Sequence, residues 1–139
     1  MILNLTQHIA SQAQEVDGVI EPSTKNKKKI VELITFSSIA DTSAIEQATR
    51  IKSLISIIRE EGCLSIMIGG APFFMSALEL TLVSEGFYPL YAFSQRVSEE
   101  IDGVKTSKFK HLGFIESKLY DTYEDMCQQA NGNVSIKLA

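Results

Sequence analysis

The sequence has few of the residues that build metal sites or disulfide frameworks. Two cysteines, Cys63 and Cys127, and two histidines stand among 139 residues. None of them has a partner at the spacing of a zinc site, and two distant cysteines define no disulfide framework. We therefore expect no metal and no cofactor, and the thiols indicate a reducing cytoplasm.

Long apolar runs and an excess of positive charge are also absent. No stretch approaches the roughly 20 apolar residues of a membrane span, and the first residues, MILNLTQH, lack the basic region of a signal peptide. Lys and Arg total 13 against 17 Asp and Glu, so the net charge of −4 does not attract nucleic acid phosphates. We expect a cytoplasmic protein whose partners are neither membranes nor long nucleic acids.

The composition is that of a folded domain, with 45% hydrophobic and 22% charged residues. A chain of this length buries roughly 65 to 70% of its unfolded surface, which is enough for a core without covalent or metal support. The sequence predicts one α/β domain over residues 1–139, in which residues 117–139 form a candidate C-terminal appendage.

A strand, a glycine turn and a helix follow one another in the middle of the chain. Residues 63–68 (CLSIMI) form a nearly continuous apolar run of strand length, typical of a parallel sheet covered on both faces. Gly69 and Gly70 end this run. Pro72 fits the first position of an apolar helix over 73–85, where its missing N–H costs nothing.

Similar patterns predict the elements on either side of this unit. Ser43 and Glu46 match the S-x-x-E capping box and predict a helix that stops at Gly62. Residues 2–5 and 87–93 are β-prone runs. The order of strands and helices favours an α/β fold with a mostly parallel sheet flanked by helices.

The segment between the first strand and this helix gives weaker signals. Residues 9–22 contain Gly18 and Pro22 and predict a connection with one helical turn. Ser23 or Thr24 is the candidate cap of a short helix through Lys29, Ile30, Leu33 and Ile34, although its early lysines are poorly placed against the positive end of the helix dipole. These lysines are interpreted as a solvated face.

An Asp-Gly pair at 102–103 predicts a β-hairpin that extends the sheet in the antiparallel direction. A two-residue turn there places Ser94 opposite His111 and Arg96 opposite Phe109, with all four side chains on one face. The exposed apolar hairpin favours a homodimer or a higher homo-oligomer.

Polar residues follow three of the predicted strands. If these strands run parallel, their ends at 6–8, 69–72 and 94–96 share one edge, which is where open α/β sheets bind ligands. The glycines let the backbone approach an anion at the start of a helix. The candidate ligand-binding residues are Thr6, Gln7, His8, Gly69, Gly70, Ala71, Phe73, Ser94, Arg96, Lys110 and His111.

Each of these candidates has a structural alternative. The alternative for the glycine pair is a tight turn with no role in binding, because the sequence lacks a dinucleotide fingerprint and a P-loop lysine. Arg96 can hold two phosphate oxygens or pair with a hairpin glutamate. His8 and His111 can act as acid and base, bind phosphate, or cap loops. Phe73 can stack on a base or belong to the core.

Four sequence blocks carry a resemblance to other proteins. Residues 4–8 (NLTQH), 67–75 (MIGGAPFFM), 89–94 (PLYAFS) and 109–114 (FKHLGF) resemble, in this order, a group of small, largely uncharacterised phage and bacterial proteins. The tail from residue 117 departs from that group, and the resemblance implies no established activity. The expected fold is similar to Rossmann-like domains that bind cyclic oligonucleotide messengers in bacterial antiviral defence, although architecture does not imply function.

Three functions are compatible with these features. The first is the sequestration of a phosphorylated nucleotide-like small molecule, such as a bacterial immune second messenger, at the carboxyl edge of the sheet. The second is metal-independent cleavage of a cyclic nucleotide messenger, a phosphodiesterase or ring nuclease reaction assisted by His8 or His111. The third is a non-catalytic protein-interaction module. Whether the protein is an enzyme stays open, and sequestration needs no catalyst.

Overall fold

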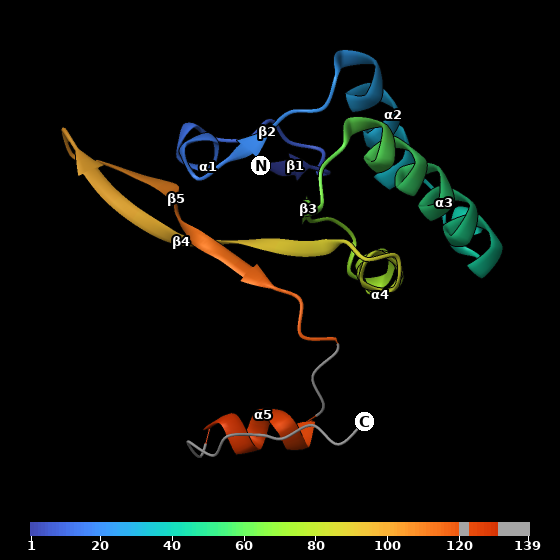
Figure 1. Cartoon of the computed structure of the whole chain (residues 1–139). Coiled ribbons are helices and arrows are strands. Elements are labelled where there is room, and N and C mark those ends of the chain that lie inside the picture. The colour runs from blue at the N-terminus through green and yellow to red at the C-terminus, as the bar shows by residue number, and fades with distance from the viewer. Residues whose placement is uncertain (120–122, 131–139) are drawn as a thin grey trace.

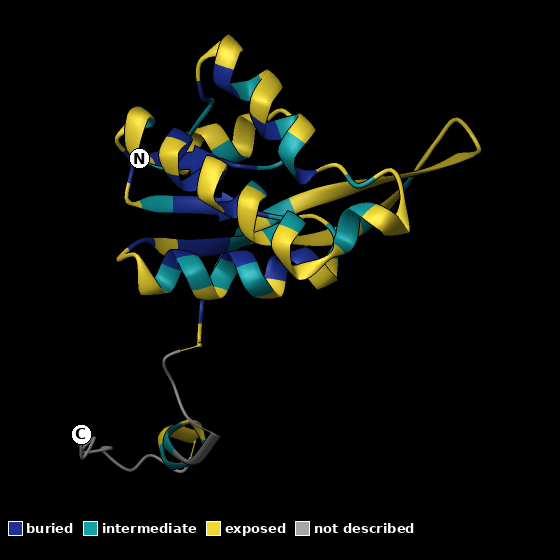
Figure 2. Cartoon of the chain, turned by 90° about the vertical axis from the view of Figure 1, so that its right-hand side faces the viewer, coloured by how far each residue is buried: buried dark blue, intermediate teal, exposed yellow. Residues whose placement is uncertain are grey.

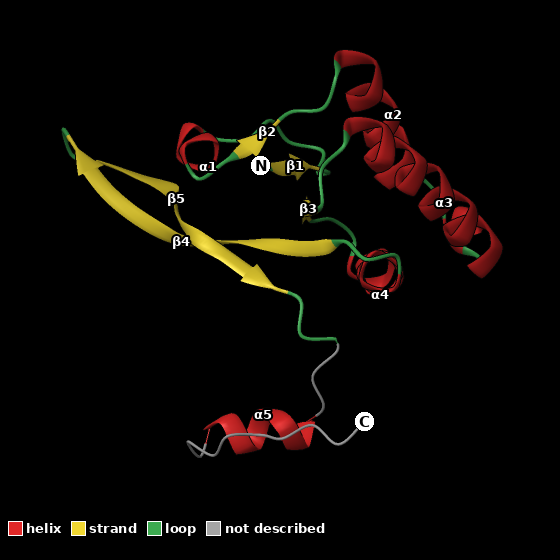
Figure 3. Ribbon diagram, in the orientation of Figure 1, coloured by secondary structure: helices red, strands yellow, loops and turns green. Residues whose placement is uncertain are grey.

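A computed structural model describes residues 1–119 and 123–130 of the chain and contains one five-stranded sheet. Along the sheet the strands are β2 (Val19–Ile20), β1 (Ile2–Asn4), β3 (Ser65–Ile68), β4 (Tyr88–Ile101) and β5 (Val104–Glu116). Neighbours from β2 to β4 run parallel, and β5 is antiparallel to β4 (Figures 1 and 3). The predicted α/β, Rossmann-like class is confirmed.

Helices cover the sheet unequally on its two sides. On one face lie α2 (Thr24–Ile34), α3 (Ala44–Glu61) and α4 (Pro72–Ser84), while the short α1 (Gln12–Val16) lies against the other (Figure 1). The remaining elements are a 3₁₀ turn, η1 (Ile39–Thr42), and α5 (Tyr123–Ala130). No helix in the described ranges is long and apolar enough to cross a lipid bilayer.

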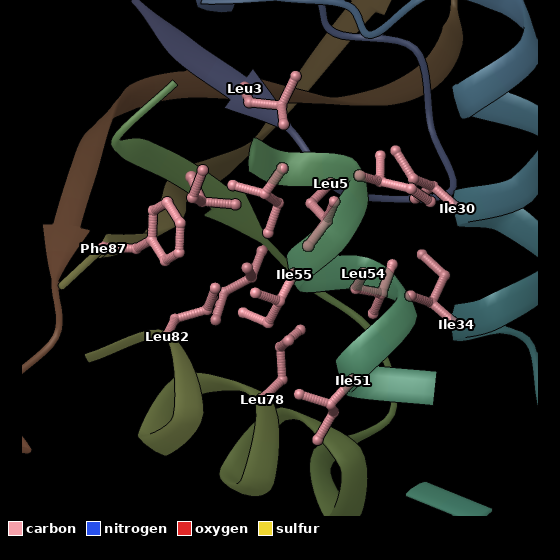
Figure 4. Packing of buried hydrophobic residues seen from close by; sticks show 14 of the residues in the cluster. Leu3, Leu5, Ile30, Ile34, Ile51, Leu54, Ile55, Leu78, Leu82 and Phe87 are labelled. Carbon is pink, nitrogen blue, oxygen red and sulfur yellow. The ribbon is translucent and has the colours of Figure 1, made fainter. Parts of the chain in front are cut away.

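The main core lies between the sheet and the three larger helices. Side chains alternate along β3, so that Ile66 and Ile68 enter this core while Met67 packs on the side of α1. Helix residues such as Leu54 and Leu78 belong to the same core, and both are fully buried (Figure 4). Burial on both faces therefore accounts for Ile66, Met67 and Ile68 of the CLSIMI run, whereas Leu64, just before β3, is 62% exposed.

The helix boundaries follow the sequence signals. At the start of α3, the Ser43 hydroxyl accepts a hydrogen bond from the Glu46 N–H at 3.2 Å, and at its end Gly62 adopts a φ of 77°. Ser23 caps α2 in the same way, through the Asn26 N–H. Pro72 is the first residue of α4.

Two expectations about strands were wrong. Residues 9–22 hold the expected helical turn as α1, but they also hold the strand β2, which was not expected, and Val19 pairs with Ile2 of β1. A two-residue strand is too short to show an alternating pattern. The strand expected to end at Phe93 instead continues to Ile101 as one side of a long hairpin.

The hairpin has the predicted turn and register. Asp102 and Gly103 both have positive φ, 53° and 78°, and Ile101 faces Val104 across the turn. A bulge at Phe93/Ser94 shifts the register, and Ser94 pairs with His111 as predicted. We call the distal part of the hairpin, residues 96–109, the arm. Figure 2 shows this exposed part projecting beyond the helices. Self-association through the arm stays a prediction.

Residues 117–119 continue from the end of β5, and the candidate appendage over 117–139 stays a prediction. Ser117 is buried and its N–H donates to the Pro89 carbonyl at 3.2 Å. In the sequence, Tyr120, Tyr123 and Met126 stand at helical spacing, and α5 covers Tyr123–Ala130. The sequence also has a short strand-like run at 134–138 (VSIKL), which lies outside the described residues.

A pair of leucines on α4 tests the packing. Leu78 is fully buried, whereas Leu80, two residues further along, is 58% exposed. Leu78→Ala is expected to lower the free energy of unfolding by about 2 to 5 kcal/mol because it leaves a cavity in the core. Leu80→Ala is expected to change it by less than about 0.5 kcal/mol. Urea denaturation of both variants measures the difference, and equal losses would contradict this arrangement of α4.

Candidate functional site

A cavity of about 520 Å³ opens at the carboxyl ends of β1 and β3. The segment after β1 borders one side and the glycine turn between β3 and α4 borders the other. The structure therefore brings together six of the residues that the sequence singled out, which are Thr6, Gln7, His8, Gly69, Gly70 and Ala71.

The third predicted strand end, residues 94–96, does not reach this cavity. Because β4 continues as the hairpin, it contributes Tyr91 and Ala92 to the lining, while Ser94 and Lys110 lie further out and are exposed. The Arg96 guanidinium donates to the Ser107 hydroxyl at 3.0 and 3.2 Å on the arm. Neither Lys nor Arg occurs among the described residues that line the cavity.

The two histidines lie at different hollows. His8 lines the cavity and is exposed. His111 instead borders a hollow beside α1, where its Nε2 is 2.9 Å from an Asp17 carboxylate oxygen and its ring contacts Phe114 edge-on. No described residue pairs with the buried His111 Nδ1. The expectation that both histidines approach one edge is wrong for His111, because Asp17 holds it against α1.

Phe73 also lies away from the cavity lining. Its ring is 48% exposed and packs edge-on against Phe36, with 5.0 Å between ring centroids. The Arg50 guanidinium lies 4.2 Å from the centre of the same Phe36 ring. Phe73 therefore belongs to an aromatic cluster beside the start of α4.

The glycine turn exposes backbone amides at the start of α4. Gly70 has a φ of 154°, a backbone conformation that glycine adopts most easily. Serine side chains cap α1, α2 and α3, but the capping position of α4 is Ala71, which has no side-chain hydrogen bond there. Pro72 has no N–H, and the N–H groups of Phe74 and Met75 donate to the Ala71 carbonyl. The amides of Gly70 and Ala71, which precede α4, and the helix dipole therefore give this side of the cavity a partial positive charge.

A buried polar network shapes the other side of the cavity. Asn4, at the end of β1, is completely buried, and its Oδ1 accepts from the Thr6 N–H and hydroxyl at 3.0 and 2.7 Å. Its Nδ2 donates to the His8 carbonyl at 2.7 Å and to the Glu21 carboxylate at 2.8 Å. These bonds fix the backbone of the turn after β1.

Lys27 completes this network from the first turn of α2. Its Nζ donates to the carbonyls of Thr6 and His8 at 2.9 and 2.8 Å and lies 3.2 Å from the Glu21 carboxylate. The interpretation of the lysine run as a solvated face is therefore wrong for Lys27. Its unfavourable place at a helix start was the available signal, because such a lysine needs acceptors elsewhere.

The environment of Glu21 favours its charged form. Burial raises the pKa of the Glu21 carboxyl. Hydrogen bonds from Asn4 and the Ala10 N–H, together with the bond and charge of Lys27, outweigh that effect and hold the pKa below the ordinary 4.5. Glu21 is thus an ionised anchor, and the network has no spare charge to offer a ligand.

A larger groove of about 990 Å³ lies between α3 and α4. It is lined by helix side chains, among them Ala48, Ile51, Ala77 and Thr81, and it is remote from the strand ends. Ligand sites in open α/β sheets lie at the carboxyl ends of the strands. We therefore take the smaller cavity as the candidate site. Within the described part of the chain, no cluster of three His, Cys, Asp or Glu is placed to hold a metal ion.

Comparison with known proteins identifies a family for this chain but assigns it no function. The model of the uncharacterized protein MJ1673 family matches residues 1–115. The chain belongs to this family. The region shared with the MJ1673 family includes all the residues that line the cavity, whereas α5 follows it. No functionally curated protein and no solved structure matches the chain.

The Glu21 network predicts a pH-dependent loss of stability. Because folding lowers the Glu21 pKa, its contribution is complete above about pH 4.5 and is lost as the pH falls through the lower folded value. Glu21→Gln is therefore expected to destabilise the protein at pH 7 and much less at pH 3. Urea denaturation between pH 3 and pH 7 measures the difference in free energy of unfolding between wild type and Glu21→Gln. Glu32→Gln, at an exposed glutamate, is the control. If Glu21→Gln destabilised the protein equally at every pH, the role of Glu21 as an ionised anchor would be contradicted.

Proposed function

We propose that the protein binds a phosphorylated, nucleotide-like small molecule in the cavity at the carboxyl ends of β1 and β3. The observation that carries this proposal is the meeting of the glycine turn, the start of α4 and the side chains of Gln7 and His8 at one cavity. Its volume, about 520 Å³, falls in the range of small-molecule sites.

The chemistry of the two sides suggests how such a ligand would lie. A phosphate suits the amides of Gly70 and Ala71, where N–H groups and the helix dipole favour negative charge. Gln7 donates only a long 3.3 Å hydrogen bond to Thr35, so its amide is available to a base or ribose. Without Lys or Arg among the described lining residues, a ligand of low charge fits best.

The placement of the histidines favours sequestration over cleavage. His8 has no second histidine at the cavity, because His111 contacts Asp17 at the hollow beside α1. Cleavage by acid–base catalysis needs two groups at the scissile bond, and the partner of His8 would have to be a residue other than His111. Cyclic nucleotide messengers are one class of suitable ligand and belong in the test.

Matched substitutions test the site. The probes are the four ribonucleoside 5′-monophosphates, cyclic di-AMP and cyclic di-GMP, measured by isothermal titration calorimetry. Gln7→Ala is expected to weaken binding by about 0.5 to 1.5 kcal/mol through one lost hydrogen bond. Arg96→Ala should leave the affinity unchanged, because Arg96 lies on the arm. Absence of binding by every probe, or weakening by Arg96→Ala alone, would contradict the proposal.

Mass spectrometry of the bound probe separates sequestration from cleavage. A sequestering protein releases the intact probe on denaturation, whereas a phosphodiesterase releases a smaller product. If a product forms, His8→Ala should abolish it while leaving binding largely intact. Product formation by wild-type protein would exclude pure sequestration.

A further inference from the structure

A second hollow lies against the first on the other side of the glycine turn. Its volume is about 470 Å³, and it shares Gly69, Gly70 and Tyr91 with the first cavity. One molecule placed at the turn can therefore extend from one hollow into the other.

Two polar side chains from neighbouring elements meet in this second hollow. Tyr91 of β4 is paired with Ile68 of β3 and points to the same face, toward α4. Glu79 lies on α4 seven residues after Pro72, which is about two helical turns. Pro72 and Glu79 therefore line the hollow from the same face of α4. Tyr91 and Glu79 thus both border this hollow, and the Glu79 carboxylate lies close enough to the Tyr91 phenol to raise its pKa.

The state of this pair defines what it can bind. Burial raises the pKa of the Tyr91 phenol, and the hydrogen bond to Glu79 and its negative charge raise it further. The phenol is therefore protonated at neutral pH. A carboxylate has about four acceptor sites on its two oxygens, of which the phenol proton can occupy one. The remaining sites accept hydrogen bonds and repel a phosphate.

We propose that the Tyr91–Glu79 pair binds the sugar hydroxyls of a ligand whose phosphate lies at Gly69–Ala71. This inference rests on the proposed function and narrows it to ribonucleotides, because ribose places vicinal hydroxyl donors next to a phosphate. Amides on one side of the turn attract the anionic group, and the carboxylate on the other side selects the neutral, donor-rich group. The two hollows thus impose one orientation on the ligand.

Calorimetry with paired probes tests this assignment. Each 5′-ribonucleotide is compared with its 2′,3′-dideoxy form, and each cyclic dinucleotide with its 2′-deoxy form. Wild-type protein should prefer the hydroxylated probe by about tenfold, and Glu79→Gln and Tyr91→Phe should reduce this preference to about twofold or less. Tyr88→Phe is the control, because Tyr88 lies on the same strand and is mostly exposed.

The outcomes separate this inference from the proposed function. Equal affinity of wild-type protein for both members of each pair overturns the role of Tyr91 and Glu79 but keeps binding at the turn. A preference that survives Glu79→Gln, in a variant whose thermal unfolding matches wild type, also overturns it. Failure of every phosphorylated probe to bind overturns both proposals.

Discussion

The cavity depends on how the chain leaves β1. A strand that ends inside a sheet must satisfy its following carbonyl and amide groups, because unpaired buried polar groups are costly. Here Asn4, Glu21 and Lys27 satisfy them together. The Asn4 amide binds the backbone of the turn, and the Lys27 ammonium holds the carbonyls of Thr6 and His8. The network uses groups from β1, α2 and the segment before α2, so the shape of the turn is tied to how these three parts of the chain lie together.

The opposite side of the cavity has a different physical basis. The turn at Gly69 and Gly70 is formed by backbone, and Ala71 leaves the start of α4 without a side-chain cap. One side of the cavity is therefore rigid and internally neutralised, and the other offers amides with partial positive charge. This asymmetry supports an anion at the turn, with polar groups of the ligand turned toward Gln7 or toward the Tyr91–Glu79 pair.

Local chemistry explains which parts of the fold the sequence could predict. Serine caps, Pro72 and the Asp-Gly turn act over a few residues, so α3, α4 and the hairpin register could be predicted directly. The two-residue β2 depends on its pairing with β1, which leaves no periodic signal, whereas the run over 87–93 and the first side of the hairpin were predicted separately although they form the single strand β4. In the same way, six cavity residues follow from the strand ends, whereas the partners of Lys27 and the displacement of Arg96 onto the arm depend on tertiary structure.

The most direct test of binding at the strand ends is a two-dimensional amide NMR titration of the full chain with the tightest-binding nucleotide. We predict that the largest shifts fall on the amides of residues 69–71 and 6–8, and that those of the arm at 96–109 barely move. Shifts centred on the arm, or on the groove between α3 and α4, would contradict binding at this cavity.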